Sequence, residues 1–530
     1  MEFFLRLLQL IFKILYMIAY PLWCFFLPRK GPSTIPPIRD RLLTLSVGEV
    51  LELYKQRKLK STRLVKAYFD RVIEVNSHIH AVVQDRFNEA LEEAARADEL
   101  IARTPDTELP ALFNRQKLLG VPFTVKESCG LKDMPFRVGS RQRANIICHA
   151  NGEAVNNLVA AGGIPILVSI TPEYCFSMET NPATQQRCVN PHDSRRTAGG
   201  SSGGEGALNA AGASLFGIGS DIGGSIRYPS LFCGVFGHKP TGGITSIEGH
   251  FPNCKDKDCL EYLQMGPITR FGRDLSLLME VMAGENAGLL DLSTPVETKD
   301  IKVFYALGFS GLNGLLHRSP SKEIKVSIMS AVKFLQTRVS HTQKMSMSAF
   351  KNSLEMSIGG LVLLKDFPYL INSSSTHKIR EHLVEICKAV LTQSEYSNEA
   401  LYFDALRRLN GCMRTEAMLR YKAEVEVLKS TFARMLGDNG VLFFPTFPVP
   451  ALHTYSSLLA LWNVDYTMIF NIIGFPTTHI PLGRDGDDLP VGFQVVAAPY
   501  KDKLCFQIAR ELEAAFCGWV IPTPHEFQPS

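Results

Sequence analysis

The sequence predicts an α/β fold with a large hydrophobic core, and three observations support this. Of the 530 residues, 45% are hydrophobic and 20% are charged, which is enough apolar material for a large core. Residues 215–219 form an apolar run bounded by glycines and read as a buried strand; the small residues at 206–213 before them predict a closely packed helix. Farther along, a helical charge pattern at 406–436 precedes a strand-like run at 440–445.

The amino-terminal residues 7–27 are mostly apolar, interrupted by Gln9 and Lys13. Twenty-one helical residues would extend about 31 Å, close to the roughly 30 Å hydrocarbon thickness of a bilayer. We therefore expect a membrane anchor over residues 1–30 and a linker over 31–44. Because Lys13 shortens the apolar run and Pro21 favours a kink, a hairpin-like or shallow anchor remains an alternative to a span.

Two glycine-flanked serines are the strongest chemical signal in the chain. Residues 199–204 read Gly-Gly-Ser-Ser-Gly-Gly, and Ser225 ends the segment Ser-Asp-Ile-Gly-Gly-Ser at 220–225. A serine hydroxyl is a weak nucleophile and needs a base that removes its proton. Lys126 follows the apolar run 121–125, and burial lowers the pKa of a lysine enough for it to act as a base, as in known Ser-Lys sites.

The glycines beside Ser225 permit a sharp turn, and such a turn can aim successive backbone N–H groups at one point. We therefore predict an oxyanion hole formed by the N–H groups of Ile222, Gly223, Gly224 and Ser225.

Each motif also has a simpler interpretation. The segment 199–204 alone is typical of a flexible loop, and a lysine in the position of Lys126 commonly reaches solvent at the end of a strand. A phosphate-binding loop is disfavoured because Glu205 follows Gly204 where a lysine is required. A nucleophile elbow is disfavoured because the preceding residues 192–197 are polar and do not predict a strand. The joint occurrence of the three motifs favours a hydrolase.

Taken in order, segments 122–126, 199–204 and 219–229 resemble the amidase signature family. Within that family, the segments around Ser201 and Ser225 look most like fatty acid amide hydrolases, those of the second type in particular. Further similar pieces extend the resemblance from about residue 45 to the carboxyl terminus: 237–241, 266–270, 474–477 and 489–494.

The resemblance implies one large α/β domain over residues 45–530, with a twisted mixed β-sheet surrounded by helices. It implies that Ser225 is the nucleophile that forms an acyl-enzyme and that Lys126 is the base. Ser201, on a cis peptide, would relay the proton between them. Ser202 would hydrogen-bond to the catalytic group and would not attack the substrate. No metal or organic cofactor is implied. The match is weakest over 300–440, so we expect substrate specificity to reside there.

An anchor joined to an amidase indicates a substrate that partitions into membranes. We expect hydrolysis of primary fatty amides such as oleamide, and of N-acylethanolamines such as anandamide, to fatty acid plus ammonia or amine. The expected location is a membrane of the endoplasmic reticulum or lipid-droplet type. One alternative is a glutamine amidase subunit that supplies ammonia to a partner. The other is an inactive membrane protein that binds lipid.

Other partners are less well supported by the sequence. A net charge of +4 without a concentrated basic run gives no case for nucleic acid. Among the twelve cysteines, the pair Cys254 and Cys259 has no second pair at zinc-site spacing, so we expect no metal site. The sequence leaves the oligomeric state open, a homodimer included.

Within the predicted helix at 406–436 we place six residues on core faces: Met418, Leu419, Tyr421, Val425, Val427 and Leu428.

Overall fold

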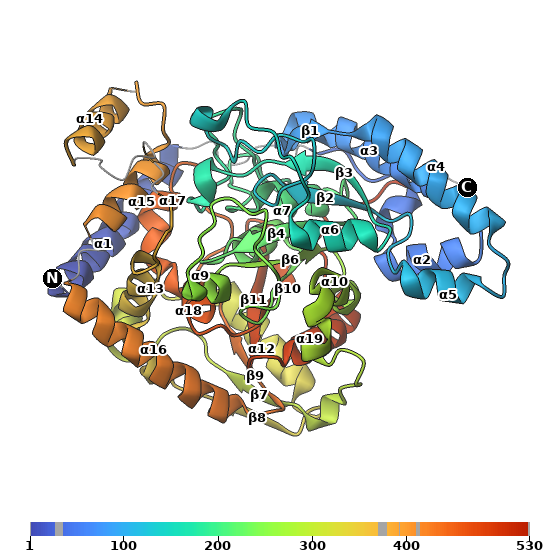
Figure 1. Cartoon of the computed structure of the whole chain (residues 1–530). Helices are drawn as coiled ribbons and strands as arrows, with labels where there is room; N and C mark the ends of the chain where they lie inside the picture. The colour runs from blue at the N-terminus through green and yellow to red at the C-terminus, as the bar shows by residue number, and fades with distance from the viewer. Residues whose placement is uncertain are drawn as a thin grey trace.

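An eleven-stranded mixed sheet runs through the part of the chain that the computed structural model describes, residues 2–26, 35–368, 371, 379–391, 393–409 and 414–527 (Figure 1). The strand order across the sheet is β1-β3-β2-β4-β6-β5-β10-β11-β9-β7-β8. The strands are β1 (Val82–Asp85), β2 (Pro122–Lys126), β3 (Ile164–Ser169), β4 (Phe216–Asp221), β5 (Phe236–Lys239), β6 (Gln264–Thr269), β7 (Lys302–Tyr305), β8 (His341–Lys344), β9 (Gly440–Phe444), β10 (Thr477–Arg484) and β11 (Pro490–Ala497).

Parallel and antiparallel pairs alternate by region. Strand β2 pairs in parallel with both β3 and β4, and β7 pairs in parallel with β8 and β9. The pairs β4–β6, β5–β6, β5–β10, β10–β11, β9–β11 and β1–β3 are antiparallel. The predicted mixed sheet is therefore confirmed.

Helices surround this sheet, as predicted (Figure 1). Those before β6 are α1 (Glu2–Phe26), α2 (Val47–Lys55), α3 (Ser61–Ile79), α4 (Phe87–Arg103), α5 (Leu109–Arg115), α6 (Glu153–Ala160), α7 (Gly203–Ala210), α8 (Arg227–Cys233) and α9 (Lys257–Tyr262). Those after it are α10 (Leu275–Met282), α11 (Gly311–Leu316), α12 (Lys322–Leu335), α13 (Ser353–Val362), α14 (Ile379–Val390), α15 (Asn398–Arg408), α16 (Thr415–Leu436), α17 (Ser457–Ala460), α18 (Asp465–Ile472) and α19 (Asp502–Phe516).

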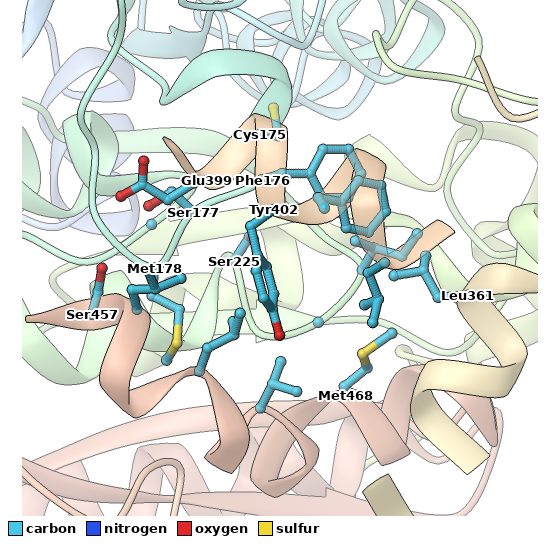
Figure 2. Close-up of a pocket in the computed structure, with 18 of the residues that line it drawn as sticks. Cys175, Phe176, Ser177, Met178, Ser225, Leu361, Glu399, Tyr402, Ser457 and Met468 are labelled. Atoms are coloured by element: carbon cyan, nitrogen blue, oxygen red, sulfur yellow. The ribbon is translucent and has the colours of Figure 1, made fainter. Parts of the chain in front are cut away.

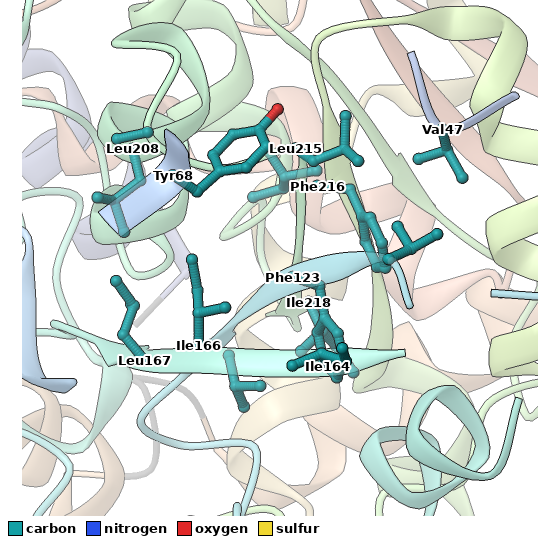
Figure 3. Packing of buried hydrophobic residues seen from close by; sticks show 14 of the residues in the cluster. Val47, Tyr68, Phe123, Ile164, Ile166, Leu167, Leu208, Leu215, Phe216 and Ile218 are labelled. Atoms are coloured by element: carbon teal, nitrogen blue, oxygen red, sulfur yellow. The ribbon is translucent and has the colours of Figure 1, made fainter. Parts of the chain in front are cut away.

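The core beneath the central strands fixes where the site lies. Phe123 on β2 stacks on Phe216 on β4, with ring centroids 5.4 Å apart, and both side chains are fully buried (Figure 3). Helix α7 has a glycine at position 206 because it packs closely on α8 there. A Cβ added at Gly206 would lie 2.8 Å from the Cβ of Pro229, which no real pair of carbons tolerates. This close packing brings the two serine-bearing loops together.

Three of the predicted elements form nearly where expected. The helix predicted at 206–213 is α7, the strand predicted at 215–219 is β4, and the strand predicted at 440–445 is β9.

The helical pattern at 406–436 covers the end of α15, which ends at Arg408, and all of α16, which begins at Thr415. Two of the residues placed on a core face are exposed, Leu419 at 56% and Val427 at 65%. The buried positions of α16 follow strict helical spacing instead: Met418, Tyr421, Val425, Leu428, Phe432 and Leu436.

The amino-terminal apolar segment forms α1, but no helix among the described residues is long and apolar enough to cross a membrane. A membrane span is therefore not supported by the helix that the structure describes, and residues 27–34 lie outside the description. Helix α1 packs against α11, and against α17, which is labelled near it in Figure 1. In the predicted linker, Ile35 and Ile38 are buried in the core.

The face that α1 turns toward the protein is mixed: Leu8, Phe12 and Tyr16 pack against apolar clusters, and polar side chains lie beside them. Arg6 forms a 2.6 Å ion pair with the buried Glu355, Gln9 lies 3.1 Å from His317 Nε2, and the Lys13 ammonium donates to the Leu315 carbonyl. Every side chain of α1 that the structure describes as exposed is apolar: Leu7, Leu10, Ile11, Ile14, Leu15, Met17, Ile18, Ala19 and Leu22.

Candidate active site

Lys126 and Ser201 meet at the carboxyl end of β2. Lys126 is the last residue of that strand and is completely buried. Its Nζ lies 2.7 Å from Ser201 Oγ and 2.9 Å from the hydroxyl oxygen of Ser220, the residue before the last of β4. The parallel pairing of β2 with β4 places these groups at one edge of the sheet. The peptide bond between Gly200 and Ser201 is cis, as the resemblance implied.

Ser225 lies in the turn between β4 and α8 and is partly accessible. It lines a small cavity of about 310 Å³ together with Ser201 and Ser220. It also lines a larger pocket. No hydrogen bond joins Ser225 Oγ to Ser201 among the residues that the structure describes, although the Ser202 N–H donates to the Ser225 carbonyl at 3.1 Å. Ser201 and Ser225 therefore line one cavity, and Lys126 reaches it only through its bond to Ser201.

A buried ion pair holds the turn that carries Ser225. The Arg227 guanidinium donates to both carboxylate oxygens of Asp221, at 2.9 and 3.0 Å, and both side chains are fully buried. Burial alone would raise the pKa of Asp221, but the charge and hydrogen bonds of Arg227, with the amide of Asn471, hold it well below its usual range. Asp221 is therefore a permanent anion that fixes the turn.

Asp221 also changes the predicted oxyanion hole. The Gly224 N–H donates to Asp221 Oδ1 at 2.7 Å, so it is already engaged in this structure. The N–H groups of Ile222, Gly223 and Ser225 have no acceptor among the described residues, and they stay candidates for the oxyanion hole. The predicted set of four is therefore narrowed to three available groups.

Ser202 is fully buried and faces the backbone rather than the cavity. Its hydroxyl lies 3.4 Å from both the carbonyl oxygen and the amide nitrogen of Ser220. It contacts the strand end that carries Ser220, and it cannot reach a substrate. Its predicted supporting role remains a prediction.

Three further polar residues belong to this site, and the sequence reasoning assigned none of them a role. The Ser220 hydroxyl oxygen accepts from Lys126 Nζ, and His250 Nε2 lies 2.9 Å from the same hydroxyl. Glu205 is fully buried and accepts from Ser169 Oγ at 2.7 Å and from Thr124 Oγ1. Burial raises the pKa of Glu205 to about 7, against the hydrogen bonds and the nearby Lys126 charge, which lower it. For Glu205 the sequence did offer one signal: it is the only carboxylate in α7, a helix made mostly of glycine, alanine and leucine.

The larger pocket beside Ser225 is apolar and encloses about 980 Å³ of space, part of it open to solvent (Figure 2). Phe176 and Phe403 stack across it with ring centroids 3.6 Å apart. Glu399 is a carboxyl group in this lining, and burial raises its pKa. Helices α13, α15 and α17 and the turn after α17 supply further large side chains of the lining: Leu354, Ile358, Leu361, Tyr402, Leu406, Leu458, Leu461 and Trp462.

Metal ligands do not gather at this site. Within the described ranges, no group of three or more His, Cys, Asp or Glu side chains is placed to hold a metal ion.

Comparisons with known proteins agree with this geometry. The family model Amidase matches residues 63–506. The fatty-acid amide hydrolase 2-B of Danio rerio is 36% identical over 501 residues, which cover 93% of each chain. The fatty-acid amide hydrolase 2 of Homo sapiens is 35% identical over 508 residues, again 93% of each chain. A solved structure of a fatty acid amide hydrolase shares the fold, with a TM-score of 0.68 and 19% identity over 90% of this chain and 85% of that one.

The mixed sheet, the paired lysine and serine, and the second serine beside an apolar pocket define the class of serine hydrolases. The chain belongs to the amidase signature family, and it is an amide hydrolase.

Proposed function

We propose that this protein is a membrane-associated serine amidase that hydrolyses long-chain fatty acid amides. The substrates would be primary amides such as oleamide and N-acylethanolamines such as anandamide. The observation that carries the proposal is the placement of Ser225 in the lining of a long apolar pocket and, at the same time, beside the Lys126–Ser201 pair. The names of the relatives with about 35% identity support the same substrate class.

The pocket chemistry favours a hydrocarbon chain. Each CH₂ group that moves from water into an apolar environment contributes about 0.8 kcal/mol, so a long acyl chain binds better than a short one. A glutamine side chain is short and polar, and the aromatic and aliphatic lining gives it few partners. The pocket therefore supports a lipid amide over the glutamine alternative.

The proposed reaction uses the three residues in sequence. Neutral Lys126 accepts the Ser201 proton while Ser201 accepts the proton of Ser225, whose Oγ then attacks the amide carbonyl carbon. The free N–H groups of the 222–225 turn stabilise the oxyanion. The proton returns through Ser201 to the leaving nitrogen as the C–N bond breaks. A water molecule then attacks the acyl-enzyme by the reverse proton path and releases the fatty acid.

Helix α1 supports a shallow association with a membrane surface. Its inward face carries both apolar and polar side chains, but every side chain described as exposed is apolar, unlike a surface helix that faces water. Leu312 and Leu315 of the adjacent α11 are 54% and 70% exposed and extend this apolar surface. Helix α1 also contacts α17, whose Leu458 lines the pocket. We propose that these helices lie on a membrane of the endoplasmic reticulum or lipid-droplet type.

The test is release of free fatty acid from oleamide and anandamide presented in phosphatidylcholine vesicles. We expect Ser225→Ala to abolish release, and Ser357→Ala, at a buried serine of α13 outside the pocket lining, to retain it. Turnover of glutamine without turnover of either lipid would favour the glutamine alternative. Vesicle binding without any turnover would favour the lipid-binding alternative.

A further inference from the structure

His250 is a buried histidine in contact with the site, and its surroundings fix which nitrogen carries a proton. The side chain is 3% exposed, and its Nδ1 lies 2.8 Å from the carbonyl oxygen of Pro252. A carbonyl oxygen only accepts hydrogen bonds, so Nδ1 must be the donor and carry the hydrogen.

The other nitrogen is therefore an acceptor as long as the ring is neutral. Burial, and after it the charge of Lys126, lowers the pKa of His250 to about 3, so the ring is neutral at physiological pH. Nε2 lies 2.9 Å from Ser220 Oγ. The Ser220 hydroxyl must donate its single proton to His250 in this contact.

The hydrogen bond from Ser220 to His250 also determines how Ser220 contacts the lysine. Because the Ser220 proton is committed to His250, Ser220 Oγ can only accept from Lys126 Nζ, 2.9 Å away. The Ser220 carbonyl, at 3.4 Å, is a second acceptor for the same amine. A neutral amine has two hydrogens and one lone pair. With its hydrogens directed to these two oxygens, the lone pair remains for the hydroxyl of Ser201, at 2.7 Å.

We propose that His250 is a positioning residue that acts through Ser220 to direct the lone pair of Lys126 toward Ser201. Without the histidine acceptor, the Ser220 hydroxyl is free to rotate and donate its own proton to the lysine, in competition with Ser201. The inference rests on the proposed role of Lys126 as the base. It adds a residue from the loop after β5, 124 positions beyond the lysine in the sequence.

The titratable groups around His250 come from several segments. Lys126 ends β2, Cys129 forms a β-bridge with His250, and Tyr174 and Cys175 line the same small cavity. Burial raises the pKa of both Cys129 and Tyr174 to about 12, so both groups are neutral near physiological pH. Lys126 is thus the group that His250 reaches through the Ser220 hydroxyl.

The first experiment compares kcat, KM and the pH profile of kcat/KM for His250→Leu and the wild type. We expect kcat to fall by about tenfold or more with KM nearly unchanged, because general-base catalysis of this kind contributes about 10²–10⁴-fold. The acid limb of the profile should move to lower pH, because a hydrogen bond that Ser220 donates to the lone pair stabilises the neutral amine. His250→Gln should recover most of the loss, since its amide oxygen is able to replace Nε2 as an acceptor. The matched control is His479→Leu on β10. His479 is equally buried and bonds Thr446 Oγ1 at 2.8 Å, and its replacement should leave the profile unchanged.

A double-mutant cycle with Ser220→Ala separates positioning from a general structural effect. If His250 acts through Ser220, the double variant is no slower than the slower single variant. Multiplicative losses, or a wild-type profile for His250→Leu, would overturn the inference. If His250→Leu does not fold, the pH profiles of Ser220→Ala and His250→Gln test the positioning role of His250. A wild-type profile for Ser220→Ala then overturns that role.

Lys126→Ala in the same assay tests the proposed function separately. An unchanged pH profile for that variant removes the lysine as the base whatever His250 does. A changed profile for Lys126→Ala with none for His250→Leu rejects the positioning role alone.

Discussion

The two sides of the active site are built on different physical principles. One side, which we name the polar wall, comes from the ends of β2 and β4 and the turn after β4: Lys126, Ser201, Ser220, Asp221 and Arg227. The other, the helical wall, comes from α13 and α15: Leu354, Ile358, Leu361, Phe403 and Leu406. The polar wall is held by directional bonds between buried groups, and the helical wall by packing of apolar side chains.

Because of this difference, we expect the polar wall to carry out the reaction and the helical wall to determine which substrate is preferred. A buried polar group that loses its partner retains a large desolvation cost, so each member of the polar wall is fixed by the others. An apolar lining tolerates changes in shape at lower cost, because hydrophobic contacts are not directional. We therefore expect substitutions in the polar wall to abolish the reaction or the fold, and substitutions in the helical wall to change the preferred substrate.

The largest effect should come from Lys126→Ala in the polar wall. Without the amine, neither serine has a base, and we expect kcat/KM to fall by about 10³-fold or more at neutral pH. Part of the activity should return in alkaline solution, where hydroxide replaces the base. The measurement is kcat/KM against pH for wild type and variant, at protein concentrations corrected for folded fraction. A variant with the wild-type profile would exclude the lysine as the base.

The next effect is on stability, from Arg227→Met. It removes one partner of a completely buried ion pair and leaves Asp221 as an uncompensated charge, which costs about 3–5 kcal/mol of unfolding free energy. The control is Lys66→Met, which breaks a pair between side chains 63% and 61% exposed and should cost less than about 1 kcal/mol. Urea unfolding measures both. Equal losses in the two variants would contradict the distinction between buried and exposed pairs.

Parts of the polar wall could be predicted from the sequence, and parts could not. The motifs around Lys126, Ser201 and Ser225 each lie within one short segment of sequence, so each could be recognised directly. His250 could not be predicted, because its contact with Ser220 depends on a loop that the tertiary fold brings back across β4. The engagement of Gly224 by Asp221 depends in the same way on turn geometry rather than on composition.

The helices were predicted less well, for a reason visible in α16. Hydrophobic residues at Leu419 and Val427 look like core residues, yet they are exposed, while neighbours at spacings of three and four are buried. Hydropathy alone does not say which face of a helix meets the core. The same ambiguity led to the membrane-span prediction for α1, whose polar residues face the protein.

A smaller, pH-dependent effect is expected at Glu205, which lies behind Lys126. Its pKa of about 7 exceeds the ordinary 4.5 of the unfolded chain, so between these values the folded protein binds the additional proton. Wild-type stability from this group is present below pH 4.5 and is lost as pH rises toward 7. Relative to Glu205→Gln, which resembles the protonated form, the wild type should therefore lose about 2–3 kcal/mol between pH 5 and 7. Urea unfolding at several pH values measures the difference, and a constant difference would contradict the raised pKa.

The smallest effect should come from the helical wall, through Ile358→Trp in α13. Ile358 lines the apolar pocket, and an indole ring in its place should exclude roughly two or three CH₂ groups of an acyl chain. At about 0.8 kcal/mol per CH₂, the preference for long over short acyl amides should fall by about 10–50-fold, with kcat on the short substrate retained. The measurement is kcat/KM for a series of primary amides of increasing chain length. Val326→Trp, on an α12 side chain that is 52% exposed and outside the pocket, is the control and should leave the series unchanged. A uniform loss across all chain lengths would mean that the helical wall supports the reaction itself, and the two walls would no longer be separable.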